Sequence, residues 1–396
     1  MQLAKASCKT FVVLCGLLTL VHAYDLVREY SGITFFDNWD FYGFRDNLTL
    51  GNVYWLDEPD AFSQSLAYVN GAGNAVIKVD DTHTVQNPQN RNSVRITTQD
   101  WYAVGSLWII DLVHMPFGCS VWPAFWTLGS GTWPNGGEID IIEGINQMPS
   151  NQYALHSTPG CYHNSTPPNQ IGETLTTDCS SAAGCTVGEL QPNSYGSGFA
   201  AMGGGVFATQ FRCYRRPNVP ASINQSTSTS AIDISQWGPP SASYLASGQC
   251  NITEFFTPQQ LVLDITLCGE WAGLPQFYLP ACGSQGPTGI CYNDSVVGSG
   301  SNYDEAYFEV AYIRAYTTGG AVPTPTAAPF EIASKVDVTA YPGYGSISKT
   351  ATASVGTGLQ PSPLFFPGNA ARSVRLGSHG CWWVVLIGMG LLVRMV

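Results

Sequence analysis

The chain has 396 residues, of which 44% are hydrophobic and 11% are charged, and its formal net charge at pH 7 is −12. This composition supplies a large core, and single β-sandwich or barrel domains often reach about 200–250 residues. Binding to nucleic acid is excluded, because it depends on Lys and Arg that contact the phosphate backbone, and the chain has only 16 of these residues.

The first 23 residues (1–23) have the pattern of a secretory signal peptide. Lys5 and Lys9 precede the apolar run FVVLCGLLTLV, and the small residue Ala23 ends the sequence VHA. This order of positive charge, apolar run and small residue is typical of a signal that is cleaved. We therefore expect a secreted, extracellular protein whose mature chain begins at Tyr24.

Residues 24–317 are predicted to form one all-β domain. Short β-prone runs such as NAVIKVD, SLWIIDLVHM, QLVLDITLC and FEVAYIRAY alternate with clusters of Gly, Pro, Asn and Ser, and no long stretch repeats at helical period. Many short strands separated by turn residues predict an antiparallel β-sandwich or jelly roll. No internal repeat is evident, which argues against a propeller or a solenoid.

The run GEIDIIEG, at residues 137–144, places three carboxylates in an otherwise apolar strand. Side chains of a strand alternate between its faces, so Glu138 and Asp140 share a face and Glu143 would point to the opposite one. If one of the two Ile residues before Glu143 bulges out, all three acids return to one face, and such bulges are frequent beside active sites. The carboxyl groups could then approach the separation of about 5–5.5 Å found in retaining glycosidases.

The surrounding sequence offers these acids no counter-charge. No Lys or Arg occurs between Arg95 and Arg212. Like charges in one site raise the pKa of at least one member, which places a proton donor beside a carboxylate that can attack. Glycoside hydrolysis requires this division of roles. A calcium site or a solvated sheet edge is the alternative interpretation, and a structural calcium ion stays possible.

The predicted domain contains nine cysteines, an odd number. They are Cys119, Cys161, Cys179, Cys185, Cys213, Cys250, Cys268, Cys282 and Cys291. In an oxidising compartment most of them should pair, one should be left over, and the sequence does not determine the pairing. A zinc site is the weaker interpretation, because no short CxxC spacing and no cluster of histidines accompanies them. Five N-glycosylation sequons in the same region mark expected surface positions.

The last part of the chain resembles a stalk and a membrane-attachment signal. Residues 318–369 are rich in Thr, Ser, Pro, Ala and Gly, which predicts a flexible stalk. Residues 370–396 contain a polar spacer followed by the apolar run CWWVVLIGMGLLV, the layout of a GPI-attachment signal. The run is short for a membrane span of about 20 residues, so a transmembrane tail or an incidental apolar end is the alternative. We expect attachment to the cell surface or cell wall.

Several motifs together resemble the fungal laminarinase-like branch of glycoside hydrolase family 16. The motifs are WPNGGEIDIIEG, RNSVRI, HMPFGCSVWPAFW, NSYG, GGG and CGEWAG. The resemblance extends from about Tyr24 to Tyr316. It implies a β-jelly roll with a concave substrate cleft, and an endo-1,3(4)-β-glucanase that cleaves β-1,3 or mixed β-1,3/1,4 glucans with retention of configuration.

The resemblance also implies roles for the three acids. Glu138 is similar to the nucleophile of the family and Glu143 to its acid/base. Asp140 resembles the residue that hydrogen-bonds the nucleophile and tunes its charge. No cofactor is required for this chemistry, a β-glucan is the expected partner, and we expect a monomer.

The substrate-binding residues that the resemblance implies come from other parts of the chain. Trp126, Trp133 and Trp271 lie where relatives stack glucose units, and His156 lies where they carry a His on the adjoining strand. Arg95 is a further candidate sugar contact. A core salt bridge for Arg95 and a packed core position for His156 are the alternatives.

Two other interpretations stay open. A transglycosylase of the same family would use the same residues to pass the glycosyl group to another cell-wall glucan. A non-catalytic glucan-binding protein is less favoured, because lectin-like relatives would be expected to lose one of the two glutamates. Cys213 replaces an apolar or aromatic residue of the relatives, which makes it the candidate unpaired thiol.

Overall fold

The computed structural model describes residues 24–209, 212–215, 220–224, 231–234, 237–244 and 249–318. The predicted signal peptide, nearly all of the predicted stalk and the predicted C-terminal signal lie outside these residues. No helix within the described ranges is long and apolar enough to cross a membrane.

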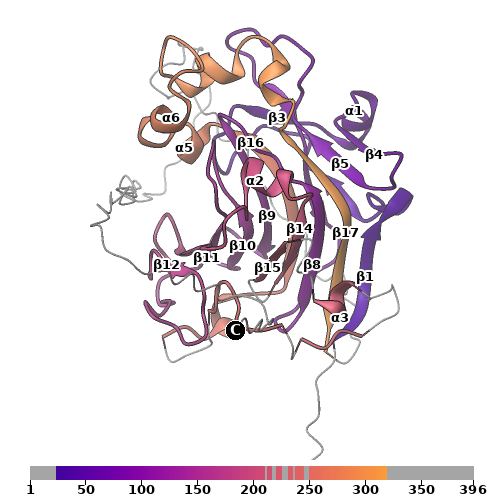
Figure 1. Cartoon of the computed structure of the whole chain (residues 1–396), viewed down its shortest axis with the longest axis vertical. Coiled ribbons are helices and arrows are strands. Elements are labelled where there is room, and N and C mark those ends of the chain that lie inside the picture. Colours follow the sequence, from indigo (N-terminus) through magenta and orange to yellow (C-terminus); the bar gives the residue numbers. More distant parts are fainter. Residues whose placement is uncertain are drawn as a thin grey trace, which may run out of the picture. The chain divides into compact units, whose positions relative to one another are not determined.

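Two antiparallel sheets form the body of the described domain (Figure 1). The strands of the first sheet are β1 Asp25–Ser31, β4 Ala67–Val69, β5 Ala75–Lys78, β8 Leu107–His114, β14 Gly205–Ala208, β15 Arg212–Arg215 and β17 Tyr307–Thr317. Their order is β15, β14, β8, β17, β5, β4, and β1 also pairs with β17. The last strand of the domain therefore lies inside this sheet.

The second sheet has eight strands and carries the acidic motif. Its strands are β2 Trp39–Phe41, β7 Arg95–Thr98, β9 Val121–Gly129, β10 Glu138–Glu143, β11 Gln152–His156, β12 Glu173–Thr174, β13 Cys185–Gly188 and β16 Gln259–Leu267. Their order is β12, β13, β11, β10, β9, β16, β7, β2, so β10 lies near the middle. A short parallel pair, β3 Val53–Trp55 with β6 Arg91–Ser93, accompanies the two sheets.

Helices are short and lie in the connections. They are α1 Glu58–Ser63, α2 Gly196–Ala201, α3 Ala221–Asn224, α4 Ile252–Phe255, α5 Gly269–Ala272 and α6 Pro275–Cys282, with 3-10 turns η1 Gly32–Thr34 and η4 Gly300–Tyr303 and a π turn η3 Tyr292–Val296. The longest of them, α6, has eight residues. The prediction of an all-β antiparallel sandwich is therefore confirmed.

The main core lies between the two sheets. In β16, Leu261, Leu263 and Ile265 belong to this core, whereas Val262 packs with residues on the opposite face of the sheet. This alternation follows from the period of two in a strand. Every residue of β16 is nonetheless buried, because loops and side chains also cover much of the other face. Burial on both faces explains why β16 reads as an almost continuous apolar run.

Four disulfides join eight of the nine cysteines. They are Cys119 with Cys282, Cys161 with Cys250, Cys179 with Cys185, and Cys268 with Cys291. The prediction that most cysteines pair is confirmed. The side chain of Cys213 lies outside the described parts of the chain, so its free thiol stays a prediction.

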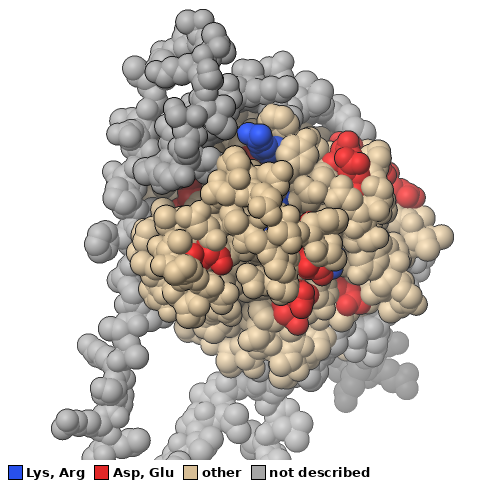
Figure 2. Space-filling model, turned by 90° about the horizontal axis from the view of Figure 1, so that it is seen from above, with Lys and Arg blue, Asp and Glu red and all other residues tan. Residues whose placement is uncertain are grey.

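The surface is poor in positive charge, as the composition indicates. Figure 2 shows a face on which most described residues are uncharged and the charged ones are mainly acidic. Such a face does not provide the array of cations that a polyanion requires.

Candidate active site

Strand β10 contains the predicted bulge. On the β11 side, Asp140 pairs with Ala154, but the next paired residue, Glu143, is opposite Gln152. Three steps along β10 thus correspond to two along β11. On the β9 side the register also shifts directly after Asp140. One extra residue is therefore accommodated between Asp140 and Glu143, and this prediction is confirmed.

The two Ile residues explain why the strand bulges here. Ile141 and Ile142 are adjacent, and both belong to the core between the sheets. A regular strand would bury one and turn the other to the opposite face. Burial of an Ile side chain contributes about 1.5–3 kcal/mol, so placing both in the core favours the bulge. The alternation resumes with Glu143 on the face that carries Glu138 and Asp140.

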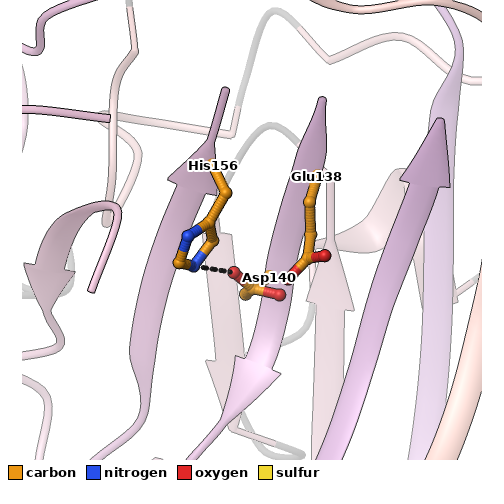
Figure 3. Close-up of side chains that lie close together, drawn as sticks. All are labelled: Glu138, Asp140 and His156. Atoms are coloured by element: carbon orange, nitrogen blue, oxygen red, sulfur yellow. Dashed lines mark ion pairs between the residues drawn. The ribbon is translucent and has the colours of Figure 1, made fainter. Parts of the chain in front are cut away.

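Glu138, Asp140 and His156 form a compact cluster on this face (Figure 3). His156 lies on β11, directly opposite Glu138 in the register. Its Nε2 atom is 3.4 Å from Oδ2 of Asp140. Asp140 is buried, with 2% of its surface exposed, and the two glutamates are partly exposed. The middle acid thus has little access to water, whereas the outer two can reach a bound molecule.

Each glutamate accepts a hydrogen bond from a tryptophan. Nε1 of Trp133 donates to Oε2 of Glu138 over 2.7 Å, and Nε1 of Trp122 donates to Oε1 of Glu143 over 3.1 Å. An N–H donor stabilises the ionised form of a carboxyl and orients it. The indole rings therefore hold both carboxyls in place from opposite ends of the cluster.

Burial raises the pKa of all three carboxyls. The pKa of Glu138 rises well above its ordinary value, first because of burial and then because of the charge on Asp140. Burial raises the pKa of Asp140 to about 7. Burial and the charge on Asp140 raise the pKa of Glu143 to about 8. The cluster therefore retains at least one proton near neutral pH, and its titration belongs to the group as a whole.

The acids and His156 are also possible metal ligands. One donor atom each from Glu138, Asp140 and His156 lie within 4.8 Å of one another. Calcium prefers a set of oxygen ligands, and this set includes an imidazole, so the residues fit calcium poorly. The expectations of no required cofactor and of a possible structural calcium ion stay predictions.

The predicted sugar-stacking tryptophans differ in their exposure. Trp133 has 41% of its surface exposed, and its ring lies 5.7 Å from that of His156. Trp271 is partly exposed and packs edge-on against Trp122 at 5.4 Å. Trp126 is buried, and its Nε1 donates to Asp264 over 2.9 Å. Trp133 and Trp271 are thus the two that present an accessible ring beside the acids.

Arg95 lies in a second cluster on the same face. Its guanidinium is 5.1 Å from the ring centre of Trp126 and 4.9 Å from that of Tyr42. It is buried, with 2% exposed, and it lies opposite Asp264 in the register of β7 and β16. Burial raises the pKa of Asp264 to about 6, and the charge on Arg95 opposes this effect. The predicted sugar contact by Arg95 stays a prediction.

Two contacts of the site were not predicted. Trp122 belongs with Trp126 and Trp133 to the tryptophans upstream of the acids whose rings suit stacking on sugars, but its hydrogen bond to Glu143 was not foreseen, although it lies four residues before Trp126 and so on the same strand face. Asp264 is the single acid in the apolar run QLVLDITLC. A lone acid in a buried strand is costly unless it has a partner, and this signal could have identified it.

Comparisons with known proteins agree with this geometry. Residues 39–316 match the family model described as the XgeA-like catalytic domain of glycoside hydrolase family 16. A probable glycosidase of Schizosaccharomyces pombe is 36% identical over 306 residues, which are 74% of this chain and 69% of that protein. An endo-1,3(4)-β-glucanase of Emericella nidulans is 33% identical over 78% of this chain, but the match spans only 50% of the relative. The chain thus spans about half the length of several of its relatives.

Solved structures show the same fold. Laminarinase 16A from Phanerochaete chrysosporium, solved with two β-glucans, has a TM-score of 0.69 and is 31% identical; the match covers 74% of this chain and all of that one. An elongating β-1,3-glucosyltransferase of the same family has a TM-score of 0.67 and is 36% identical, over the same shares. The predicted resemblance is confirmed.

Proposed function

Because the chain belongs to glycoside hydrolase family 16, we propose that it is a retaining endo-β-glucanase that cleaves internal β-1,3 or mixed β-1,3/1,4 glucosidic bonds. The observation that carries this proposal is the bulge in β10, which places Glu138 and Glu143 on one face with Asp140 between them. The relatives named as endo-1,3(4)-β-glucanases support the substrate class.

In the first step, Glu138 attacks the anomeric carbon as a carboxylate. The bond from that carbon to the leaving glucan oxygen breaks, and Glu143 donates its proton to this oxygen. The product is a glycosyl-enzyme ester on Glu138 and a shortened glucan. Burial and the charge on Asp140 raise the pKa of Glu138, whereas the charge on His156 and the hydrogen bond from Trp133 lower it and so favour the ionised nucleophile. The raised pKa of Glu143, about 8, keeps its proton available near neutral pH.

In the second step, Glu143 acts as a base. It takes a proton from water while the water oxygen attacks the anomeric carbon, which releases Glu138 as a carboxylate and the sugar with its original configuration. Asp140 and His156 lie between and beside the two glutamates. We assign them the tuning of charge on Glu138 during both steps, since the charge on Asp140 raises the pKa of Glu138 and the charge on His156 lowers it.

Incubation of the secreted domain with laminarin, lichenan, xyloglucan and agarose tests the activity. Shorter oligosaccharides from laminarin or lichenan are expected. The Glu138→Gln variant should lose turnover but still bind the glucan. For Glu143→Ala, azide should restore cleavage of an activated aryl glycoside and form a β-azide, because azide displaces Glu138 from the same face as water. Formation of an α-azide, or cleavage by Glu138→Gln, would contradict the mechanism.

A transglycosylase is the second candidate function. The observation that favours it is the likeness to the elongating β-1,3-glucosyltransferase, which is 36% identical to this chain. In that case the hydroxyl of a second glucan replaces water in the second step. Products longer than the starting oligosaccharide would indicate transfer, whereas only shorter products indicate hydrolysis.

We also propose that the enzyme acts outside the cell, attached to its surface. The signal-peptide pattern at 1–23 and the GPI-like layout of residues 370–396 support this, as do the four disulfides, which form in oxidising compartments. Treatment of intact cells with a GPI-specific phospholipase should release the glucanase activity. Activity that stays on the cells would contradict GPI attachment.

A further inference from the structure

The motif NSYG, at residues 193–196, has no part in the reaction proposed above, yet it lies directly beneath the acidic strand. Ser194 and Tyr195 are almost fully buried, with 1% and 0% exposed. The ring of Tyr195 packs against Gly144, the residue after Glu143, so closely that a Cβ on Gly144 would lie 2.7 Å from the ring. Oγ of Ser194 accepts a hydrogen bond from the backbone N–H of Asn151 over 3.0 Å.

Asn151 connects this motif to the bulge. Its side chain is buried, with 1% of the residue exposed. Oδ1 accepts a hydrogen bond from the backbone N–H of Glu143 over 3.0 Å, and Nδ2 donates to the backbone carbonyl of Ile141 over 3.0 Å. One amide therefore bonds a backbone donor and a backbone acceptor on the two sides of the extra residue.

These two bonds compensate for what the bulge removes. Between Asp140 and Glu143 the regular pairing of β10 with β11 is interrupted. A buried backbone group without a partner destabilises the fold, so the bulge needs a local donor and a local acceptor. The Asn amide supplies both, whereas Asp lacks the donor and Leu lacks both groups.

We propose that Asn151 is a positioning residue for the reaction, which fixes the bulge and thereby holds Glu143 where it can transfer its proton, and that Ser194 orients Asn151. The inference rests on the proposed function of Glu143 as the acid/base. Asn151 bonds the backbone of Glu143 itself, while the carboxyl of Glu143 is held by Trp122. Displacement of a catalytic group by about 1 Å can lower a rate by about 100-fold.

The test compares the secreted wild-type protein with the variants Asn151→Ala and Asn151→Asp. Two substrates are used, laminarin and a laminari-oligosaccharide that carries dinitrophenolate as its leaving group. The dinitrophenolate leaves without a proton, so its departure does not need Glu143. We expect kcat on laminarin to fall about 100-fold for Asn151→Ala with little change in KM. Formation of the glycosyl-enzyme from the aryl substrate should be almost unaffected, and azide should accelerate its turnover.

Thr98→Val is the matched control. Thr98 is also buried in the eight-stranded sheet, and its hydroxyl accepts from the backbone N–H of Leu261 over 2.9 Å and donates to the carbonyl of Asp100 over 3.0 Å. Loss of this hydroxyl should lower the melting temperature. The ratio of the rates on laminarin and on the dinitrophenyl substrate, and the acceleration by azide, should stay as in the wild type. Ser194→Ala, which keeps the Asn151 amide, should give a smaller loss, about threefold to tenfold, of the same kind.

The outcomes separate this inference from the proposed function. If the wild-type enzyme cleaves laminarin but Asn151→Ala and Ser194→Ala keep its kcat, or lose activity equally on both substrates with no azide response, Asn151 has only a structural role and the inference fails. If Asn151→Ala does not fold, Ser194→Ala alone decides by the same criteria. If the wild type does not cleave any β-glucan while folded, the proposed function itself fails.

Discussion

Replacement of Asp140 by Asn should stabilise the protein at alkaline pH, although it should impair catalysis. Burial raises the pKa of Asp140 from its ordinary value of 3.8 to about 7. The folded protein therefore holds a proton that the unfolded chain releases above about pH 4. Stability contributed by this proton is fully present below the unfolded pKa and is lost as the pH rises through the folded pKa. Asn does not ionise and should escape this loss.

The magnitude follows from the two pKa values. One pKa unit corresponds to about 1.4 kcal/mol, so ionisation of Asp140 in the folded state costs up to about 4 kcal/mol at pH 8.5. Since the three acids titrate together, part of this cost is relieved by their neighbours. We therefore expect the difference in unfolding free energy between Asp140→Asn and wild type to become about 2–4 kcal/mol more favourable between pH 4 and pH 8.5.

Urea unfolding with intact disulfides at pH 4, 6 and 8.5 measures this difference. The substitution also alters the contact with His156. A loss of unfolding free energy that is the same at every pH cancels when the difference between variant and wild type at pH 4 is subtracted from that at pH 8.5. Glu58→Gln, an exposed change on α1, serves as the control and should keep the wild-type dependence on pH. A difference that is the same at pH 4 and pH 8.5 would refute the assignment of a raised pKa to Asp140.

Three further predictions concern the acids and the bulge. Trp133→Phe removes the hydrogen bond that the indole N–H donates to Glu138, so the pKa of the nucleophile should rise. Because a hydrogen bond to a charged group contributes about 1.5–3 kcal/mol, the acidic limb of the pH profile of kcat/KM should move up by about one pH unit. Trp122→Phe removes the bond to Glu143 and should move the basic limb upward instead; a shift of the same limb in both variants would contradict the assigned roles. Deletion of Ile142 removes the extra residue, so a regular strand would place Glu143 four positions after Glu138 and on the same face. A folded deletion variant should therefore still hydrolyse laminarin, with a loss of up to about 100-fold if Glu143 is displaced by about 1 Å; a loss of about 10⁴-fold, as for removal of general acid–base catalysis, would contradict the view that the bulge serves to keep Glu143 on this face.

The sheet class and the acidic cluster could be predicted from the sequence because both depend on local patterns. Alternation along β16 and the interrupted alternation in β10 are visible in single segments. Three acids in one apolar run are costly to bury, so they indicate a site whose chemistry needs them. The family resemblance then indicated which acid has which role. His156 was placed correctly on the adjoining strand by the same route, since it lies opposite Glu138 in the register.

The residues that the sequence did not reveal depend on contacts between distant segments. Asn151 follows the acids closely, but its function depends on hydrogen bonds to backbone groups of the bulge, which no residue pattern indicates. The hydrogen bond between Trp126 and Asp264 was not predicted either, because it joins neighbouring strands that are far apart in the chain. The disulfide pairing, such as Cys119 with Cys282, likewise requires the folded arrangement.

The position of β17 has a consequence for the order in which the domain forms during synthesis. Its last residues pair with β1 on one side and with β8 on the other, and its first residues pair with β5. Strand β1, which leaves the ribosome first, therefore cannot pair with its partner until β17, the last strand, has emerged. The seven-stranded sheet can close only after Thr317 has emerged, whereas every strand of the catalytic sheet is available once Leu267 has been translated. A nascent chain that stalls between these residues would expose the inner face of its catalytic sheet to chaperones.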